Sequence, residues 1–181
     1  MGKRLLRMAM IALPLVLMSM TAAGQESKAA PERARTELAK DDITTLMAMV
    51  GRLPAAEQDR RMERIWEDLA VGKTPRSDFL FCTGYAYLGN YKAQACLGYA
   101  YENGRGVQRD TAAAYVWYSI ALDNPIRDIV EKQKIQADRD RMKKTLLTGT
   151  PAKTEKELDD LLKTQRELKI ECQAEIRDTK F

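Results

Sequence analysis

Apolar residues recur every three to four positions along most of this chain, which is the spacing of one buried face of an α-helix. The clearest stripe in the first half consists of Ile43, Leu46, Met47 and Val50. No segment shows the strict alternation of apolar and polar residues that marks a half-buried strand. Helices are therefore predicted near residues 43–50, 62–69, 77–88, 91–102, 110–124, 126–147 and 154–176.

Short breaks separate these stripes. Glycine, proline or asparagine stands at most of the breaks, as at Gly51, Gly72, Gly89 and Pro125. Short helices joined by tight turns are typical of an all-α protein in which successive helices pack antiparallel. The C-terminal third of the chain is more charged, so the helix predicted at 126–147 is expected to bury only one narrow stripe.

The N-terminus departs from this pattern, because residues 8–20 form one uninterrupted apolar run. Lys3, Arg4 and Arg7 precede the run, and the small residues 21–24 follow it. Basic residues, a short apolar core and small residues are the three parts of a secretory signal peptide. We therefore expect a signal peptide at 1–24 and a periplasmic or secreted protein. The alternative is a retained membrane anchor, for which the run is short.

Charge and composition narrow the classes of function. The formal charge is +4, and since three basic residues and no acid lie within 1–24, the remaining chain carries only +1. This near-neutral balance gives no electrostatic reason to expect nucleic acid as a partner. The sequence contains no histidine, which removes the commonest general base and the usual nitrogen ligand of zinc. No catalytic, cofactor-binding or metal-binding residues are predicted.

The stretch 89–124 is the most patterned part of the chain. It holds a glycine-rich loop between two predicted helices, with small and aromatic residues at helical spacing on both sides. In identity and spacing it resembles the Sel-one-like repeat, a relative of the tetratricopeptide repeat. The residues that carry the resemblance are Ala93, Leu97, Gly98, Tyr101, Gly104, Gly106, Val107, Asp110, Ala114, Trp117, Tyr118 and Ala121.

The resemblance implies a short right-handed α-solenoid of antiparallel helix hairpins with C-terminal capping helices. It covers one full repeat, and the helix at 77–88 matches only as a degenerate half-repeat. The expected organisation is a signal peptide at 1–24, a flexible lead-in at 25–35, a helical repeat domain at 36–124 and a C-terminal helical cap at 125–181. Packing explains the repeat residues themselves, since small residues let helices approach and aromatic ones fill the space between them.

Two of the three cysteines occupy equivalent places in a short internal repeat, CTGYAY and CLGYAY. If the helices on either side of Gly89 form a hairpin, Cys82 and Cys96 lie level across it, about two turns from the break on each side. In an oxidising compartment they are then candidates for a disulfide bond. A bridge from Cys172 to either of them, or three unbridged cysteines, are the alternatives. One continuous helix over 77–103 would exclude the bridge between Cys82 and Cys96.

The resemblance implies a role as an exported scaffold or adaptor that contacts another protein or peptide in the cell envelope, without catalysis and without stable membrane insertion after signal cleavage. The residues nominated for the contact are Ala95, Tyr99 and Glu102, on the side of the fourth predicted helix opposite Leu97 and Tyr101. Tyr85, on the preceding helix, is nominated with them. Two alternatives stay open: a peptidoglycan-active or β-lactam-binding enzyme, and a regulator or assembly factor of an envelope complex.

Overall fold

The structure is a computed structural model that describes residues 38–73 and 75–178. The predicted signal peptide and the lead-in at 25–35 lie outside these residues. Seven α-helices make up the described part, at α1 (Lys40–Gly51), α2 (Ala55–Ala70), α3 (Arg76–Tyr87), α4 (Tyr91–Asn103), α5 (Thr111–Leu122), α6 (Ile129–Thr148) and α7 (Glu155–Asp178).

The all-α prediction is confirmed for the described residues, which contain no strand. Each predicted helix is present, and the ends differ from the predictions by a few residues. The break at Gly89 is also confirmed, because α3 ends at Tyr87 and α4 begins at Tyr91. Gly89 has a φ of 107°, a value that a residue with a Cβ rarely adopts, so the chain can turn sharply between the two helices.

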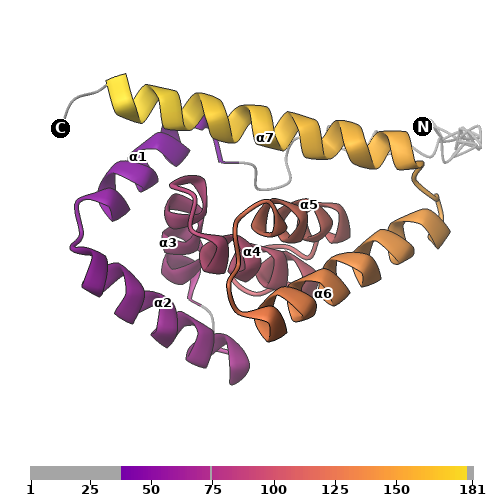
Figure 1. Ribbon diagram of the computed structural model, residues 1–181, viewed down its shortest axis with the longest axis horizontal. Helices are drawn as coiled ribbons and strands as arrows, with labels where there is room; N and C mark the ends of the chain where they lie inside the picture. Colours follow the sequence, from indigo (N-terminus) through magenta and orange to yellow (C-terminus); the bar gives the residue numbers. More distant parts are fainter. Residues whose placement is uncertain (1–37, 74, 179–181) are drawn as a thin grey trace, which may run out of the picture. The chain divides into compact units, whose positions relative to one another are not determined.

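From α3 to α6, each helix packs against the next one in the chain (Figure 1). The most extensive contacts join α4 to α5, and α5 in turn packs against α6. On the other side α3 packs against both α4 and α1. In Figure 1, α3, α4 and α5 lie in the middle, with α1, α2, α6 and α7 around them.

The loop between α4 and α5 is fixed by glycine and by a side-chain cap. Gly104 and Gly106 have φ values of 67° and 70°, in the left-handed region that glycine adopts without steric cost. The carboxylate of Asp110 then accepts hydrogen bonds from the backbone N–H groups of Ala112 and Ala113 at 2.8 and 3.1 Å, which caps the start of α5.

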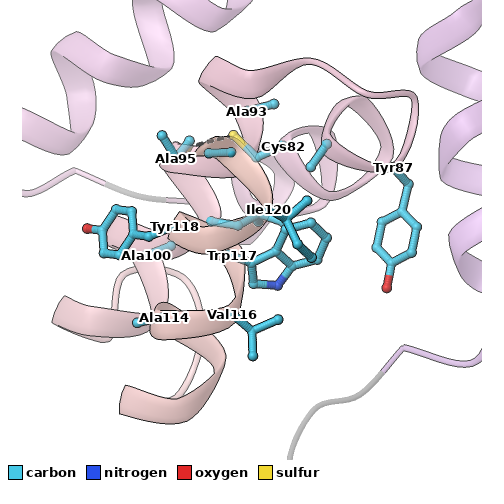
Figure 2. Packing of buried hydrophobic residues seen from close by; sticks show 14 of the residues in the cluster. Cys82, Tyr87, Ala93, Ala95, Ala100, Ala114, Val116, Trp117, Tyr118 and Ile120 are labelled. Carbon is cyan, nitrogen blue, oxygen red and sulfur yellow. Dashed lines mark hydrogen bonds between the residues drawn. The ribbon is translucent and has the colours of Figure 1, made fainter. Parts of the chain in front are cut away.

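The core lies mainly between α3, α4 and α5, and Figure 2 shows that it contains both small and aromatic side chains. Trp117 and Tyr118 of α5 are both buried. The Tyr118 ring occupies the space that a side chain at Gly98 of α4 would need. A Cβ added at Gly98 would lie 2.6 Å from the Tyr118 ring. The other repeat residues of α4 and α5 that are buried as predicted are Ala93, Leu97, Ala114 and Ala121.

The last helix returns along the molecule. α7 contacts α5, α3 and α1, so it reaches from the C-terminal to the N-terminal helices of the described part (Figure 1). Arg166 donates two hydrogen bonds to the Asp123 carboxylate at 2.8 and 2.6 Å, and Gln173 donates one to the backbone oxygen of Tyr87 at 2.7 Å. At its start, Thr154 and Glu157 form the reciprocal pair of a capping box. The C-terminal region thus ties distant helices together.

Candidate functional site

A pocket of about 320 Å³ opens between α2, α4, α5 and α6. One part of its lining is apolar or aromatic and the other part is charged. The apolar part consists of Trp66, Leu69, Ala70, Ala95, Tyr99, Tyr118 and Ile135. The charged part consists of Lys92, Glu131, Lys134 and Asp138. An apolar cavity with a few polar groups at its border is the usual form of a ligand-binding site in a protein.

The wall from α2 depends on the apolar stripe of that helix. Met62, Ile65 and Leu69 are buried, and their contact with the rest of the core sets the rotation of α2. Trp66 then faces α4, where its ring meets the ring of Tyr99 edge to face, with centroids 6.1 Å apart. These two half-buried aromatic side chains are therefore held in place before any ligand binds.

The floor of the pocket comes from α4. Ala95 and Tyr99 are one turn apart, so both project on the same side of the helix. Ala95 is buried, and its small side chain leaves room between α2 and α6 that a longer side chain would occupy. Ile135 of α6 closes the apolar surface from the opposite side, and it too is buried.

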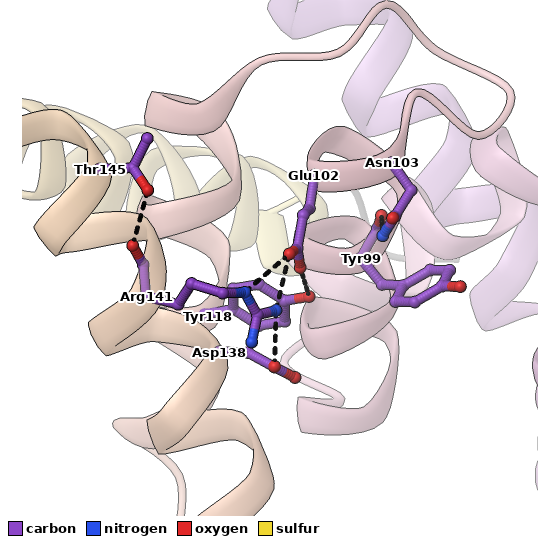
Figure 3. A network of polar contacts seen from close by, with 7 residues as sticks. All are labelled: Tyr99, Glu102, Asn103, Tyr118, Asp138, Arg141 and Thr145. Carbon is purple, nitrogen blue, oxygen red and sulfur yellow. Dashed lines mark hydrogen bonds and ion pairs between the residues drawn. The ribbon is translucent and has the colours of Figure 1, made fainter. Parts of the chain in front are cut away.

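A polar network lies beside the pocket and joins α4, α5 and α6 (Figure 3). The Tyr118 hydroxyl donates to Glu102 at 2.9 Å, and the guanidinium of Arg141 donates to the other oxygen of the same carboxylate at 2.6 Å. Arg141 also pairs with Asp138 at 2.7 Å. Figure 3 shows Tyr99 on the same helix as Glu102, with its ring turned away from the network.

The electrostatics of the network favour the protonated forms of Tyr118 and Arg141. Burial, together with the negative charge of Glu102, raises the pKa of the Tyr118 hydroxyl, so it stays protonated and donates. The hydrogen bond to Glu102 raises the pKa of the Arg141 guanidinium. The network is thus a fixed support that holds α6, and with it the α6 wall of the pocket, against α4 and α5.

A second polar contact joins α4 to α6 at the border of the pocket. The Tyr91 hydroxyl donates to the Glu131 carboxylate at 2.9 Å and so joins the first turns of α4 and α6. Burial and this hydrogen bond raise the pKa of Tyr91 to about 12. The neighbouring lysines, Lys92 and Lys134, are exposed at the same end, and neither forms an ion pair with any residue of the described ranges.

The structure brings together three of the four residues nominated for partner contact. Ala95 and Tyr99 line the pocket, and Glu102 lies one turn further along α4 in the adjoining network. Tyr85 lies elsewhere: its hydroxyl donates to Asp59 of α2 at 3.3 Å, and its side chain does not line the pocket. These contacts show where the residues lie; whether they bind a partner stays a prediction.

The remaining lining residues come from α2 and α6, which the nomination from sequence did not include. Trp66 and Leu69 fall in a stripe whose spacing predicts only burial, and nothing in the sequence indicates that Trp66 stays partly open. The sequence of the helix at 129–148 does not indicate which other helices it packs against. This helix carries Lys134, Ile135 and Asp138. The tertiary contact between α5 and α6 places them at the pocket.

The predicted level position of Cys82 and Cys96 is confirmed. Their sulfurs lie 2.8 Å apart across the α3–α4 pair, and both side chains are buried. Figure 2 shows Cys82 within the core. The two residues are thiols in the structure, as is the buried Cys172 of α7. The disulfide bond between Cys82 and Cys96 therefore stays a prediction, now with the two sulfurs in direct contact.

No family model, no curated protein and no solved structure matches this chain. Within residues 38–178, as far as the structure describes them, no helix is both long and apolar enough to cross a membrane. The same residues contain no cluster of cysteine, aspartate and glutamate side chains suited to holding a metal ion.

Proposed function

We propose that this chain is an exported scaffold or adaptor protein that binds another protein or peptide in the cell envelope and does not act as a catalyst. The observation that carries the proposal is the pocket between α2, α4 and α6, with Trp66 and Tyr99 in its wall. Tryptophan and tyrosine are enriched among the residues that dominate the energy of protein interfaces. At about 320 Å³ the pocket suits one large side chain of a partner better than a bulky cofactor.

The fold that we propose for this role is a short right-handed α-solenoid related to the Sel-one-like repeat. Three features of the α4–α5 hairpin support it: positive φ at Gly104 and Gly106, and the close approach of Gly98 to Tyr118. These are the positions at which the sequence resembles the repeat. In such an array, the stacked helices form an extended concave surface on which a partner can bind.

Export of the protein is part of the proposal and rests on the sequence of residues 1–24. The cysteine pair is consistent with an oxidising compartment, because Cys82 and Cys96 are already placed for a bond to form. In the periplasm or outside the cell, the exposed end of the pocket would meet envelope proteins directly.

Replacing Tyr99 by alanine is expected to abolish capture of the partner, whereas replacing Tyr85 by alanine is expected to leave it intact. The two tyrosines form a matched pair, since both are half-buried and each packs against another aromatic ring, but only Tyr99 lines the pocket. The measurement is affinity capture from a periplasmic extract with each variant, with captured proteins identified by mass spectrometry.

Thermal unfolding of both variants, followed by circular dichroism, is the control that separates loss of binding from loss of fold. The adaptor proposal predicts that a captured protein disappears with Tyr99→Ala while the variant is still folded. Equal capture by both variants would show that the binding surface lies outside the pocket. Turnover of a cell-wall substrate by the purified protein would contradict the absence of catalysis.

A further inference from the structure

The volume of the pocket limits the size of the group that can fill it. An apolar cavity of about 150 Å³ holds one benzene molecule, and the pocket here, at about 320 Å³, is roughly twice as large. Trp66, Tyr99 and Ile135 supply much of its apolar surface. One phenyl ring would leave a large part of that surface without contacts, whereas two fused rings would cover it. The size of the pocket therefore favours a two-ring group.

The charged side chains of the lining cancel one another. Lys92 and Lys134 carry two positive charges, and Glu131 and Asp138 carry two negative charges. An anion or a cation would therefore gain no net attraction from the lining as a whole, and it would lose hydration on entering the apolar part of the pocket. The charge balance of the pocket favours an occupant without net charge.

The same charged side chains suit a neutral ring system that has an electron-rich face and an N–H donor. Glu131, Lys134 and Ile135 lie three and four positions apart on one face of α6, so they border the same occupant. A lysine ammonium group is attracted to the face of an aromatic ring, and indole is the best of these rings. The Oε2 atom of Glu131 accepts from Tyr91, but within the described part of the chain no group donates to its Oε1 atom. A carboxylate accepts several hydrogen bonds, so Glu131 can still accept one from a ligand.

We infer that the pocket holds the indole ring of a tryptophan side chain from the partner protein. This inference rests on the proposed function and names the group that the partner contributes. Indole supplies two fused rings for the apolar surface, an aromatic face for the lysines and one N–H group for a carboxylate, and it carries no net charge. Phenylalanine lacks both the second ring and the donor, and tyrosine has a donor but only one ring. Tryptophan is also enriched among the residues that dominate the energy of protein interfaces.

The test uses N-acetyl-tryptophanamide, a neutral compound that carries the tryptophan side chain between two blocked ends. Binding to the purified protein is followed by amide chemical shifts in NMR spectra, with shifts expected at Ala95, Tyr99 and Ile135. N-acetyl-phenylalaninamide and the analogue methylated at the indole nitrogen are each expected to bind about tenfold more weakly, because the first lacks a ring and the second lacks the donor. The affinity for N-acetyl-tryptophanamide is expected to change less than about twofold with salt, since the ligand carries no charge to be screened.

The matching protein variant is Ala95→Leu, which fills the floor of the pocket and is expected to weaken binding of N-acetyl-tryptophanamide about tenfold or more. Ala137→Leu adds the same side chain at an exposed position of α6 that does not line the pocket, and it is expected to bind as the unaltered protein does. Because Ala95 is buried, the fold of both variants is checked by thermal unfolding. The comparison of ligands on the unaltered protein decides the inference even where Ala95→Leu does not fold.

Competition with the captured protein links the ligand to the partner. Excess N-acetyl-tryptophanamide is expected to reduce capture by the unaltered protein, and N-acetyl-alaninamide is expected to leave it unchanged. Equal or tighter binding of the phenylalanine or N-methyl analogue, or capture that persists in excess N-acetyl-tryptophanamide, would overturn the inference. Either result could occur while Tyr99→Ala abolishes capture, and the adaptor role would then stand with a different side chain in the pocket. Capture that ignores both Tyr99→Ala and the competitor would contradict the adaptor role of the pocket as well.

Discussion

Replacing Gly84 by alanine is expected to lower the free energy of unfolding by about 3 kcal/mol, at the upper end of the usual cost of overpacking a core. A Cβ at this position would lie 2.6 Å from the backbone oxygen of Leu46 and 3.0 Å from a methyl carbon of Val50, both on α1. A backbone oxygen cannot rotate away as a side chain can. The helices α1 and α3 must therefore separate, and buried contacts of Met47 and Val50 with the core are lost.

Gly51→Ala is the matched control for this experiment. Gly51 is the last residue of α1, and a Cβ there would meet only a methyl carbon of Leu88 at 3.9 Å, which is ordinary contact. Its replacement is expected to be neutral or to stabilise the protein by up to about 1 kcal/mol, because alanine favours helix more than glycine does. Urea denaturation of the two variants and the unaltered protein gives the comparison. Equal stabilities of the two variants would contradict the close approach of α1 and α3.

Reduction of the predicted Cys82–Cys96 bond is expected to lower the free energy of unfolding by about 3 kcal/mol, the chain-entropy value for a loop of this size. The two sulfurs lie 2.8 Å apart, so the bond requires only a small further approach. The measurement is denaturation of the protein with and without a reductant. In the double variant Cys82→Ala/Cys96→Ala, the reductant is expected to have no effect.

A count of thiols decides which cysteines are joined. Burial, together with the contact with Cys96, raises the pKa of the Cys82 thiol well above its ordinary range, so the count is made after denaturation, when every thiol can react. One thiol per chain is expected in the non-reduced protein, and none in the Cys172→Ser variant. One thiol in the unaltered protein together with two in that variant would show that Cys172 takes part in the bond. Three in the unaltered protein would mean that no bond forms.

The helical content of the chain is predictable because its signals are local. A stripe of apolar residues, a capping side chain and a glycine at a turn each act within a few residues, as Asp110 and Gly104 show at the two ends of one loop. The level position of Cys82 and Cys96 is predictable for the same reason, since it depends only on their equal distance from the break at Gly89.

The pocket was predictable only in part. Ala95 and Tyr99 can be assigned to one face of a helix by counting residues, but the walls opposite them come from α2 and α6. Those helices take their places through contacts between residues far apart in the sequence, such as Arg141 with Glu102 and Tyr91 with Glu131. A periodic pattern reports which face of a helix is buried and gives no information about what buries it.

The nomination of Tyr85 shows a related limit. In the structure, Tyr85 contacts Asp59 and the ring of Phe81, which places it apart from the pocket that Ala95 and Tyr99 line. Conversely, the buried apolar stripe of α2 does not indicate that Trp66 of the same helix lines a pocket. Both outcomes depend on how α2 packs across α3 and α4, which the spacing of apolar residues does not specify.

The most direct test of the pocket as the partner-binding site is crosslinking in living cells with a photoreactive phenylalanine derivative placed at position 134 or at position 132. Both residues are exposed lysines of α6, but only Lys134 lines the pocket, and Lys132 lies about 200° away around the helix. A partner bound in the pocket predicts a discrete protein adduct from position 134, found in the exported fraction of the cells, and none from position 132. The same adducts from both positions, or an adduct from position 132 alone, would contradict it.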